Sequence, residues 1–503
     1  MKRFFFTFAI ALAGLTMLRA QSPYAHYYEN LPVEMQQVQP LGFRDIAINI
    51  ANMGAVADGK TNNGELINKI IKKLSKQGGG TVIIPAGTWL TGPIRMQSNI
   101  NLHLEEGATL LFSTDKELYV QKSDSLRDGS KKCNACVYGS KLENVAITGN
   151  GTLDGQGLYW RPIKEKKVKK SAEDAHIWEE VLAMGGTLRP DDKTHSIWYP
   201  YNLNKELGIP NIASDPITQE KMRPHLVNIT DSKNVLIQGV TLLNSPKFHL
   251  VPTRVQNLII DGITIRCPWW AQNGDAMDPG NIQTGLIVNC NISCGDDGIC
   301  MKGGVGQKGV DAGPQSDILI MNDTVYRAHG GFVIGSEFSG GMQRIVVRNC
   351  LFDGTDIGFR FKSAPGRGGW CKDIYCVDNV VRNIREDVIL ISSGYADRGA
   401  GVSATDKDKK DAFFPDWSNI TFRNISGAVA ENVVNVEGLK GMSVHDITFE
   451  GITIYGVTDT GVKMKYAENI TFENCTFRTR KGYEFDLDDV KNIRFNGKDP
   501  LNE

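Results

Sequence analysis

Two adjacent aspartates, Asp296 and Asp297, lie between glycines in the stretch NISCGDDGICMKGG (residues 291–304). Neighbouring carboxylates disfavour each other's ionisation, so one member of such a pair keeps its proton to a higher pH. Hydrolysis of a glycosidic bond uses such a pair, because the acid protonates the leaving oxygen while the carboxylate activates a water. Two aspartates alone more often mark a turn, so this hypothesis depends on the residues around them.

Three further stretches carry charged or titratable side chains. They are NGDAMDP (273–279) with Asp275 and Asp278, AHGGFVIGSE (328–337) with His329 and Glu337, and FRFKS (359–363) with Arg360 and Lys362. Residues two apart on a strand share a face, so Arg360 and Lys362 point the same way. Their charge suits an anionic sugar, and a guanidinium can bind a carboxylate through two parallel hydrogen bonds.

A repeated pattern of short strands must position these side chains. The unit is an Asn or Asp, an alternating β-branched run, a turn, and a second short run, as in NVLIQGVTLLNS (234–245), NLIIDGITIRC (257–267) and RIVVRNCLFDG (344–354). Each unit buries one side chain in two and closes a core only by stacking on its neighbours. The pattern predicts an all-β parallel β-helix. The leucine spacing of leucine-rich repeats is absent, and the hairpin turns of a sandwich are scarce.

Stacking also brings the candidate residues together. Neighbouring coils of such a ladder lie about 4.8 Å apart. The four stretches fall on consecutive coils, with Asp275 placed 21 residues before Asp296. We therefore expect one patch that holds three or four carboxylates, one imidazole and two cations.

One helix is predicted at the N-terminal end of the stack, in TNNGELINKIIKKLSKQGGG (61–80). Its apolar residues follow the i, i+3, i+4, i+7 spacing of a single helical face: Ile67, Ile70, Ile71 and Leu74. Asn62 or Asn63 can cap its start, and the glycines at 78–80 end it. A solenoid needs a cap at its open end, so we expect this helix to cover the core.

The first twenty residues read as a secretory signal peptide, with a basic start, an apolar run and a small residue before a cut after Ala20. We expect export to the periplasm or the medium. An N-terminal extension (21–44) would precede a single β-helix catalytic domain (45–503) with a loop insertion at about 156–222. No other segment is apolar enough to span a membrane. The mature chain would carry 53 bases and 57 acids, which excludes a nucleic-acid binder by charge, and we expect a monomer.

Cysteines and asparagine sequons admit a simple structural reading. Export would permit some of the ten cysteines to pair, but most fall in predicted strands, where a free Cys behaves as a small hydrophobe. Cys133 and Cys136 form a CxxC without the partners that a zinc site needs, so no metal is expected there. The sequons recur at the turns and strands of the repeat, and we interpret them as ladder residues: Asn228, Asn291, Asn419 and Asn469.

Four motifs together resemble the polygalacturonase family, glycoside hydrolase family 28. They are Asn273-Gly274-Asp275, Gly295-Asp296-Asp297, Ala328-His329-Gly330 and Arg360-Phe361-Lys362. GAVADGKTNN (54–63) with GGGTVIIPAGTWLTGPI (78–94) is similar to the opening of pectin-active β-helix enzymes, and the resemblance covers roughly residues 45–480. The chain departs from the usual motifs at Ala276, Gly298 and Ala328, and none of these changes removes a catalytic group.

The resemblance implies a right-handed parallel β-helix and an inverting hydrolase of galacturonate-containing pectic chains that uses no metal or cofactor. HGGFVIGSEFSGG (329–341) and GRGGW (366–370) resemble bacterial exo-acting members, which implies action at chain ends. By the same resemblance Asp296 is the general acid, Asp275 and Asp297 hold and activate the water, and His329 orients the acid. Arg360 and Lys362 would bind the galacturonate carboxylate, with further substrate contacts from Asn273, Asp278 and Glu337.

Three alternatives remain open at this point. A rhamnogalacturonan hydrolase of the same family would keep the mechanism and change the substrate. A pectate lyase also uses a parallel β-helix and would hold Ca²⁺ on the aspartates, although the histidine and the acid pair fit hydrolysis better. A non-catalytic β-helix that binds polysaccharide would give no product at all.

Overall fold

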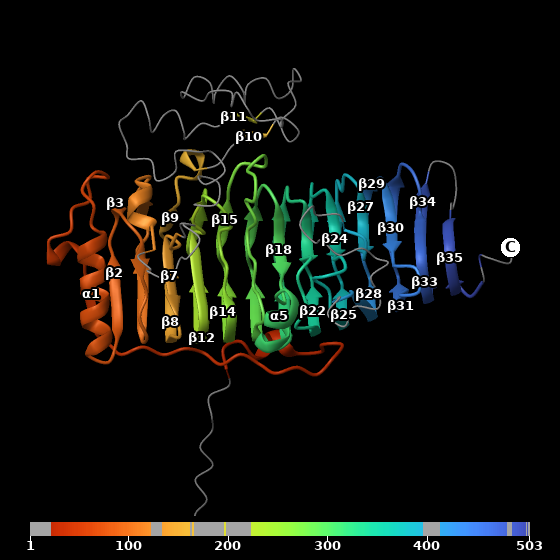
Figure 1. Ribbon diagram of the computed structural model, residues 1–503, viewed down its shortest axis with the longest axis horizontal. Coiled ribbons are helices and arrows are strands. Elements are labelled where there is room, and N and C mark those ends of the chain that lie inside the picture. The colour runs from red at the N-terminus through yellow and green to blue at the C-terminus, as the bar shows by residue number, and fades with distance from the viewer. Residues whose placement is uncertain are drawn as a thin grey trace, which may run out of the picture.

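The computed structural model describes residues 22–121, 133–160, 163–164, 196–197, 223–395, 413–479, 485–498 and 500. The predicted signal peptide and most of the predicted insertion lie outside these residues. The described chain winds into a stack of coils whose strands run side by side along one long axis (Figure 1). Every ladder within this stack is parallel, and the antiparallel pair of β10 (Ile163–Lys164) and β11 (Ser196–Ile197) lies apart from it. The predicted parallel β-helix is confirmed.

Three rows of strands run along the stack. Row 1 consists of β1 (Ala47–Asn49), β2 (Gly80–Ile84), β5 (Ile100–Leu104), β8 (Glu143–Gly149), β12 (Val227–Gln238), β14 (Thr253–Asp261), β16 (Gln283–Val288), β19 (Gln315–Met321), β22 (Met342–Arg348), β25 (Trp370–Val377), β28 (Asp416–Arg423), β31 (Val444–Glu450), β33 (Val462–Glu473) and β35 (Phe485–Phe495). Row 2 consists of β3 (Gly87–Thr91), β6 (Ala108–Phe112), β9 (Thr152–Asp154), β13 (Thr241–Leu243), β15 (Thr264–Arg266), β17 (Asn291–Ser293), β20 (Thr324–Tyr326), β23 (Leu351–Asp353), β26 (Val380–Arg382), β29 (Ser426–Ala430), β32 (Thr453–Val457) and β34 (Thr476–Thr479).

Row 3 carries the candidate site. It consists of β4 (Ile94–Arg95), β7 (Val137–Ser140), β18 (Asp297–Met301), β21 (Gly330–Ile334), β24 (Ile357–Lys362), β27 (Asp387–Ser392) and β30 (Asn432–Glu437). The long strands β12 and β33 also pair with this row, and so join it to row 1. Between β12 and β18 the row continues as single bridges through Leu250 and Met277.

Alternation along row 3 separates core from surface. Phe332, Phe359 and Ile389 share one level of the ladder and are fully buried in the core. The next level places Arg360 on the opposite face, and Lys362 follows two residues later. The core therefore fixes which side chains of each coil reach the outer surface.

Asparagines stabilise the turns before the strands, as the repeat predicted. Asn234 and Asn257 adopt left-handed backbone, with φ of 57° and 62°. Asn257 donates its amide to Asn234 at 2.8 Å, and Asn234 donates to Asn144 at 2.9 Å. The left-handed conformation costs about 1–2 kcal/mol for an ordinary residue, and these ladder hydrogen bonds offset it. The sequon Asn469 belongs to a similar ladder, because it donates to Asp446 at 3.0 Å.

The predicted capping helix is α1 (Gly64–Lys76), which lies at the N-terminal end of the stack (Figure 1). Its four predicted apolar residues are buried, and Asn62 Oδ1 accepts a hydrogen bond from the Gly64 amide at 2.9 Å. The described part of the chain also contains 3₁₀ turns: η1 (Ala25–Tyr28), η2 (Ala51–Met53), η3 (Lys116–Tyr119) and η4 (Gly157–Tyr159). A second helix, α5 (Gly306–Ala312), interrupts a coil for which the sequence predicted no helix. Seven residues between glycines are too few to show helical periodicity.

The N-terminal segment, residues 22–43, lies against the outer face of row 1 as an extended strap, seen in red along the lower edge of Figure 1. Val38 is fully buried in a cluster with Leu236, Ile259 and other row 1 residues. Gln39 exchanges two hydrogen bonds with the Asn257 side chain, at 2.8 and 2.9 Å. This segment was predicted only as an extension, and the structure adds that it is packed on the solenoid.

The ten cysteines are all free, so none of the pairings that export would permit is present. Nine of them are buried and Cys133 is partly buried. Burial raises the pKa of the Cys136 thiol above its usual range. A thiol that stays protonated is unreactive, so this cysteine behaves as a small hydrophobic side chain. No helix among the described residues is long and apolar enough to cross a membrane.

Candidate active site

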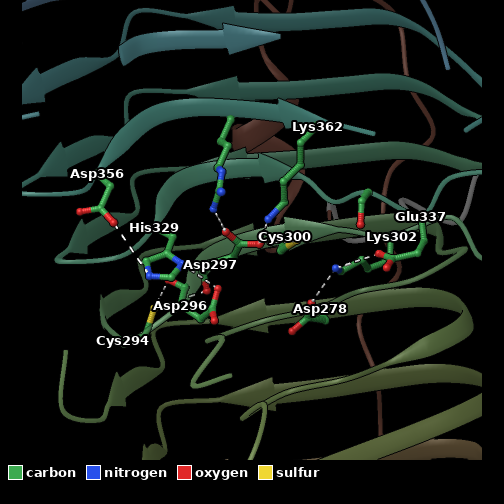
Figure 2. A network of polar contacts seen from close by, with 12 residues as sticks. Asp278, Cys294, Asp296, Asp297, Cys300, Lys302, His329, Glu337, Asp356 and Lys362 are labelled. Carbon is green, nitrogen blue, oxygen red and sulfur yellow. Dashed lines mark hydrogen bonds and ion pairs between the residues drawn. The ribbon is translucent and has the colours of Figure 1, made fainter. Parts of the chain in front are cut away.

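Consecutive coils place the four predicted stretches next to one another on row 3. Met277 pairs with Ile299, and Gly330 pairs with both Asp297 and Ile357. The ladder therefore runs from the stretch 273–279, through β18 and β21, to β24. Figure 2 shows the carboxylates, His329 and the cations gathered on the surface of these coils. The expected patch is formed.

Asp297 lies at the centre, with a side chain only 3% exposed. Lys362 Nζ donates to Oδ2 at 2.7 Å and Arg360 Nη1 donates to Oδ1 at 3.0 Å. Burial alone would raise the pKa of Asp297, but Lys362, Arg360 and Lys302 together hold it well below its usual range. Asp297 is therefore ionised, and both of its oxygens are bound to cations.

This arrangement adds a protein contact to the role expected of the two cations. Arg360 and Lys362 were predicted to face the substrate carboxylate, and in the structure both bind Asp297 first. The Lys362 side chain is 6% exposed and the Arg360 side chain 15% exposed. Arg360 thus keeps limited access to a ligand, whereas Lys362 is almost entirely committed to Asp297.

Asp275 and Asp278 are the buried acids of the cluster. Burial, followed by the charges of Asp296 and Asp278, raises the pKa of Asp275 well above its usual range. Its Oδ1 is buried and has no hydrogen-bond partner among the described residues. Burial also raises the pKa of Asp278 to about 7, although Lys302 opposes this shift. Crowding of the acids was expected to raise the pKa of one of them, and the structure shows such a rise for Asp275 and Asp278.

Asp296 points to the more open side of the cluster, with a side chain 17% exposed. Its Oδ1 lies 3.0 Å from His329 Nδ1, and the His329 amide donates to the Asp296 carbonyl at 2.8 Å. The other ring nitrogen of His329, Nε2, lies 3.9 Å from Asp356 Oδ2. Asp356 in turn contacts Arg385 Nη1 at 3.4 Å. His329 is therefore positioned between two carboxylates (Figure 2).

Lys302 connects Asp278 to Glu337 on the other side of the cluster. Its Nζ lies 3.6 Å from Asp278 Oδ1 and 3.1 Å from Glu337 Oε2. Gly335 makes room for this side chain, because a Cβ there would lie 2.7 Å from Lys302 Nζ. Burial would raise the pKa of Glu337, but Lys302 brings it below its usual value. Glu337 is thus held by protein cations, with Arg367 as its second partner at 3.4 Å.

Asn273 is placed differently from the other predicted residues. It has left-handed backbone with φ of 49°, and its Oδ1 accepts from Arg223 Nη2 at 2.9 Å. Arg223 also donates to the carbonyls of Pro246 and Gln272, at 3.1 and 3.0 Å. These contacts fix the turn that leads into Asp275. In this structure Asn273 therefore helps to fix the backbone that carries Asp275.

Comparison with known proteins identifies the family to which the sequence belongs. The model of glycosyl hydrolases family 28 matches residues 211–476, more than half of the chain. The chain belongs to glycosyl hydrolases family 28. A model described as rhamnogalacturonase A/epimerase, pectate lyase-like matches residues 47–157.

Relatives of this family 28 chain agree with the match. It is 28% identical over 439 residues to a probable polygalacturonase of Vitis vinifera, covering 85% of this chain and 77% of that protein. It is 26% identical over 471 residues to an exo-poly-alpha-D-galacturonosidase of Dickeya chrysanthemi, covering 90% and 74%. It aligns with the crystal structure of a hyperthermoactive exopolygalacturonase from Thermotoga maritima with a TM-score of 0.64 at 28% identity, covering 90% and 94%. The protein is a glycoside hydrolase.

Several residues around the family 28 site were not identified from the sequence. Lys302 carried one usable signal, because it follows Cys300 by two residues and so shares its outward face. Asp356 and Arg223 lie in irregular segments whose contacts depend on the fold. Tyr395 places its ring 5.1 Å from Lys362 Nζ and 5.7 Å from Arg360 Cζ, within cation–π distance.

Metal binding is the remaining possibility to weigh for this hydrolase. Asp296, Asp297 and His329 each offer one ligand atom within 4.8 Å of the others. Two protein cations already occupy the oxygens of Asp297, however, and a further cation would be repelled by both. The donor set therefore fits a metal poorly.

Proposed function

We propose that this family 28 hydrolase cleaves α-linked galacturonic acid chains of pectin from their ends, with inversion at the anomeric carbon. The observation that carries the proposal is the pairing of a partly exposed acid, Asp296 in contact with His329, with a buried and ionised carboxylate, Asp297. The names of the Dickeya and Thermotoga relatives support polygalacturonate as the substrate and the chain end as the point of attack.

Asp296 acts as the general acid. A general acid must touch the leaving oxygen, and the Asp296 side chain is 17% exposed whereas those of Asp297 and Asp278 are 3% and 2% exposed. Its proton passes to the glycosidic oxygen as the bond to the anomeric carbon breaks. The carboxylate that remains lies 3.0 Å from His329 Nδ1, which orients it.

Asp297 and Asp275 hold the attacking water. Asp297 contributes the fixed negative charge, which also stabilises the positive charge that develops at the anomeric carbon. Asp275 Oδ1, buried without a partner among the described residues, is available to bind that water. The water oxygen bonds to the anomeric carbon, and its proton passes to this pair of carboxyl groups.

Inversion is inferred from the two cations bound to Asp297, and not from the distance between Asp296 and Asp297. Asp296 and Asp297 place ligand atoms within 4.8 Å of each other, which is less than the roughly 6.5–9.5 Å between the carboxyl groups of most inverting enzymes. A retaining enzyme would need a free carboxylate as nucleophile. Both oxygens of Asp297 are engaged by cations at 2.7 and 3.0 Å, which makes it a poor nucleophile.

Lys302 acts as a positioning residue for the buried acids in this proposal. Its Nζ lies 3.6 Å from Asp278 Oδ1. Its positive charge lowers the pKa values of Asp278 and Asp275 and so opposes the rise that burial causes in both. Asp278 and Glu337 were expected to bind the substrate, and both contact Lys302. In this proposal they hold Lys302 in place and act on the substrate only indirectly.

The remaining parts of the proposal concern the whole protein. We propose a single catalytic domain over residues 45–503 that works as a monomer after export by the N-terminal signal peptide, either in the periplasm or outside the cell. Its partner is the acidic pectic chain itself. The charge balance of 53 bases and 57 acids after cleavage at Ala20 agrees with a soluble exported enzyme.

A product profile tests the proposed substrate and mode. Purified protein is incubated with polygalacturonate, short oligogalacturonates and rhamnogalacturonan, and the products are separated over time. Galacturonate or a single short product from the first minutes supports attack at chain ends. A ladder of oligomers would mean internal cleavage, and activity on rhamnogalacturonan alone would replace the substrate. Products with unsaturated ends would indicate a lyase and overturn the proposal.

A further inference from the structure

Recognition of a galacturonate carboxylate needs a cation with unused hydrogen-bond donors. Lys362 is committed to Asp297 at 2.7 Å, and Arg360 to the same carboxylate at 3.0 Å. Lys302 is likewise shared between Asp278 and Glu337. The cations at the centre of the cluster thus neutralise protein carboxylates, and Arg360, which is 15% exposed and whose Nε has no partner among the described residues, keeps donors for a ligand. A further cation beside the cluster would add to this recognition of the substrate's charge.

A hollow of about 200 Å³ adjoins His329 on the side away from Lys302. Its wall includes Trp269, Gly295, Arg327, His329, Asp356 and Arg385. Pockets for drug-sized ligands usually measure about 300–1,000 Å³, so this one suits a single sugar ring. It shares His329 and Asp356 with the catalytic cluster, and His329 Nδ1 lies 3.0 Å from Asp296 Oδ1 (Figure 2).

Arg327 is the cation of this hollow that remains uncommitted. Its residue is exposed, and its guanidinium has no ion pair among the described residues. Its side chain passes over Gly354, where a Cβ would lie 3.9 Å from Arg327 Cγ. Arg385, the other guanidinium, is 3.4 Å from Asp356 and therefore partly neutralised.

Trp269 is the aromatic residue in the wall of the hollow. The turn that carries it packs closely on the coil of Asp296, because Gly295 has no side chain. A Cβ at Gly295 would lie 2.4 Å from the Ala271 carbonyl oxygen. An indole beside a guanidinium combines an apolar face for a sugar ring with donors for its carboxylate.

We propose that Trp269 and Arg327 form a galacturonate-binding subsite next to the catalytic acid, in which Arg327 binds the carboxylate of a sugar that neighbours the scissile bond. The proposal rests on the proposed function and adds to it the residues that select a charged sugar. Arg327 and Trp269 belong to none of the four motifs that the sequence brought together.

Substrate charge provides the test for Arg327. The kcat/KM of wild type, Arg327→Gln and Arg494→Gln is measured on tetragalacturonate and on its fully methyl-esterified form. Arg494 is exposed on β35 at the far end of the stack and serves as the matched control. A hydrogen bond to a charged group contributes enough to change binding by about tenfold to a hundredfold. We expect Arg327→Gln to lose that factor on tetragalacturonate, mainly through KM, and little on the ester. Equal losses on both substrates, or no loss beyond that of Arg494→Gln, would overturn the subsite.

A binding measurement separates this proposal from the proposed function. Digalacturonate is titrated by calorimetry into Asp296→Asn, and into the same variant with Arg327→Gln or Trp269→Ala added. We expect each added change to weaken binding at least tenfold, while Arg494→Gln leaves it unchanged. Should wild type hydrolyse no galacturonate substrate, the proposed function fails, yet this titration still decides the subsite. Unchanged affinity in both double variants would overturn it.

Discussion

Lys362→Met tests the charge state on which the site depends. Methionine is one atom shorter than lysine, keeps an unbranched apolar stem and removes the ammonium that lies 2.7 Å from Asp297 Oδ2, while the Arg360 contact at 3.0 Å from Oδ1 is left in place. The carboxylate remains 3% exposed, so solvent replaces little of the lost charge. An opposite charge at this range moves the titration of a carboxyl by about 1–3 pH units. The pKa of Asp297 should therefore rise in the variant.

The acid limb of the kcat/KM profile reports this change. Asp297 must be ionised for the reaction, so activity falls as pH drops through its pKa. We expect the limb of Lys362→Met to lie about 1–3 pH units above that of wild type, which corresponds to roughly 1.4–4 kcal/mol of stabilisation of the ionised form. A lower kcat with an unmoved limb would refute the argument, because ionisation of Asp297 would then not control the rate.

Stability follows the same linkage. The pKa of Asp297 is lower in the folded protein, so its ionisation stabilises the fold above the unfolded pKa of about 3.9, and this stability is lost as pH falls through the folded value. The difference in free energy of unfolding between wild type and Lys362→Met should thus persist from pH 7 down to the raised pKa of Asp297 in the variant, and shrink only at more acidic pH. Lys465→Met is the control, since Lys465 pairs with Asp488 at 2.8 Å with both side chains substantially exposed. It should change neither the profile nor the stability measurably.

Other predictions concern the acid, a glycine and the N-terminal strap. Asp296→Asn should lower kcat by at least about a hundredfold with the fold intact; circular dichroism checks the fold, and retention of a tenth of kcat would contradict the role. Gly149→Ala adds a Cβ 2.0 Å from the Leu104 carbonyl oxygen, so it should lose far more stability to urea than Gly262→Ala, which has open space and should cost about 1 kcal/mol; similar losses would count against the steric argument. Val38→Asp places a charge in a fully buried contact and should destabilise the protein by about 3 kcal/mol or more; an unchanged urea midpoint would mean that the strap does not stabilise the solenoid.

Periodicity made the fold and the location of the site predictable. Alternation placed Arg360 and Lys362 on one face, and the repeat length placed Asp275, Asp297 and His329 on neighbouring coils. These features depend on spacing along the chain, which the sequence contains. The parallel ladders then convert that spacing into proximity at about 4.8 Å per coil.

Partner choice among the charged groups was not predictable in the same way. The resemblance assigned Arg360 and Lys362 to the substrate, and the structure adds that both bind Asp297, a contact that the sequence did not predict. Which of several nearby carboxylates a long side chain reaches depends on burial and on side-chain torsions. Lys302 was missed for the same reason, because its contacts with Asp278 and Glu337 require the empty space above Gly335.

Segments without a repeat gave the least information. Residues 22–43 were expected only as an extension, because nothing local indicates that Val38 docks on row 1 more than a hundred positions away. The helix α5 spans seven residues, which is shorter than the window in which a helical period can be recognised. In both cases contacts distant in sequence decide the structure.

The most direct test of the central claim is the configuration of the first product. Proton nuclear magnetic resonance follows hydrolysis of tetragalacturonate by wild-type enzyme, with readings taken before the anomers equilibrate. A partly exposed general acid, Asp296, and a cation-bound Asp297 that only holds water predict the β-anomer first from an α-linked chain. If the α-anomer appears first, a carboxylate of the site acts as nucleophile, and the roles assigned to Asp296 and Asp297 are wrong.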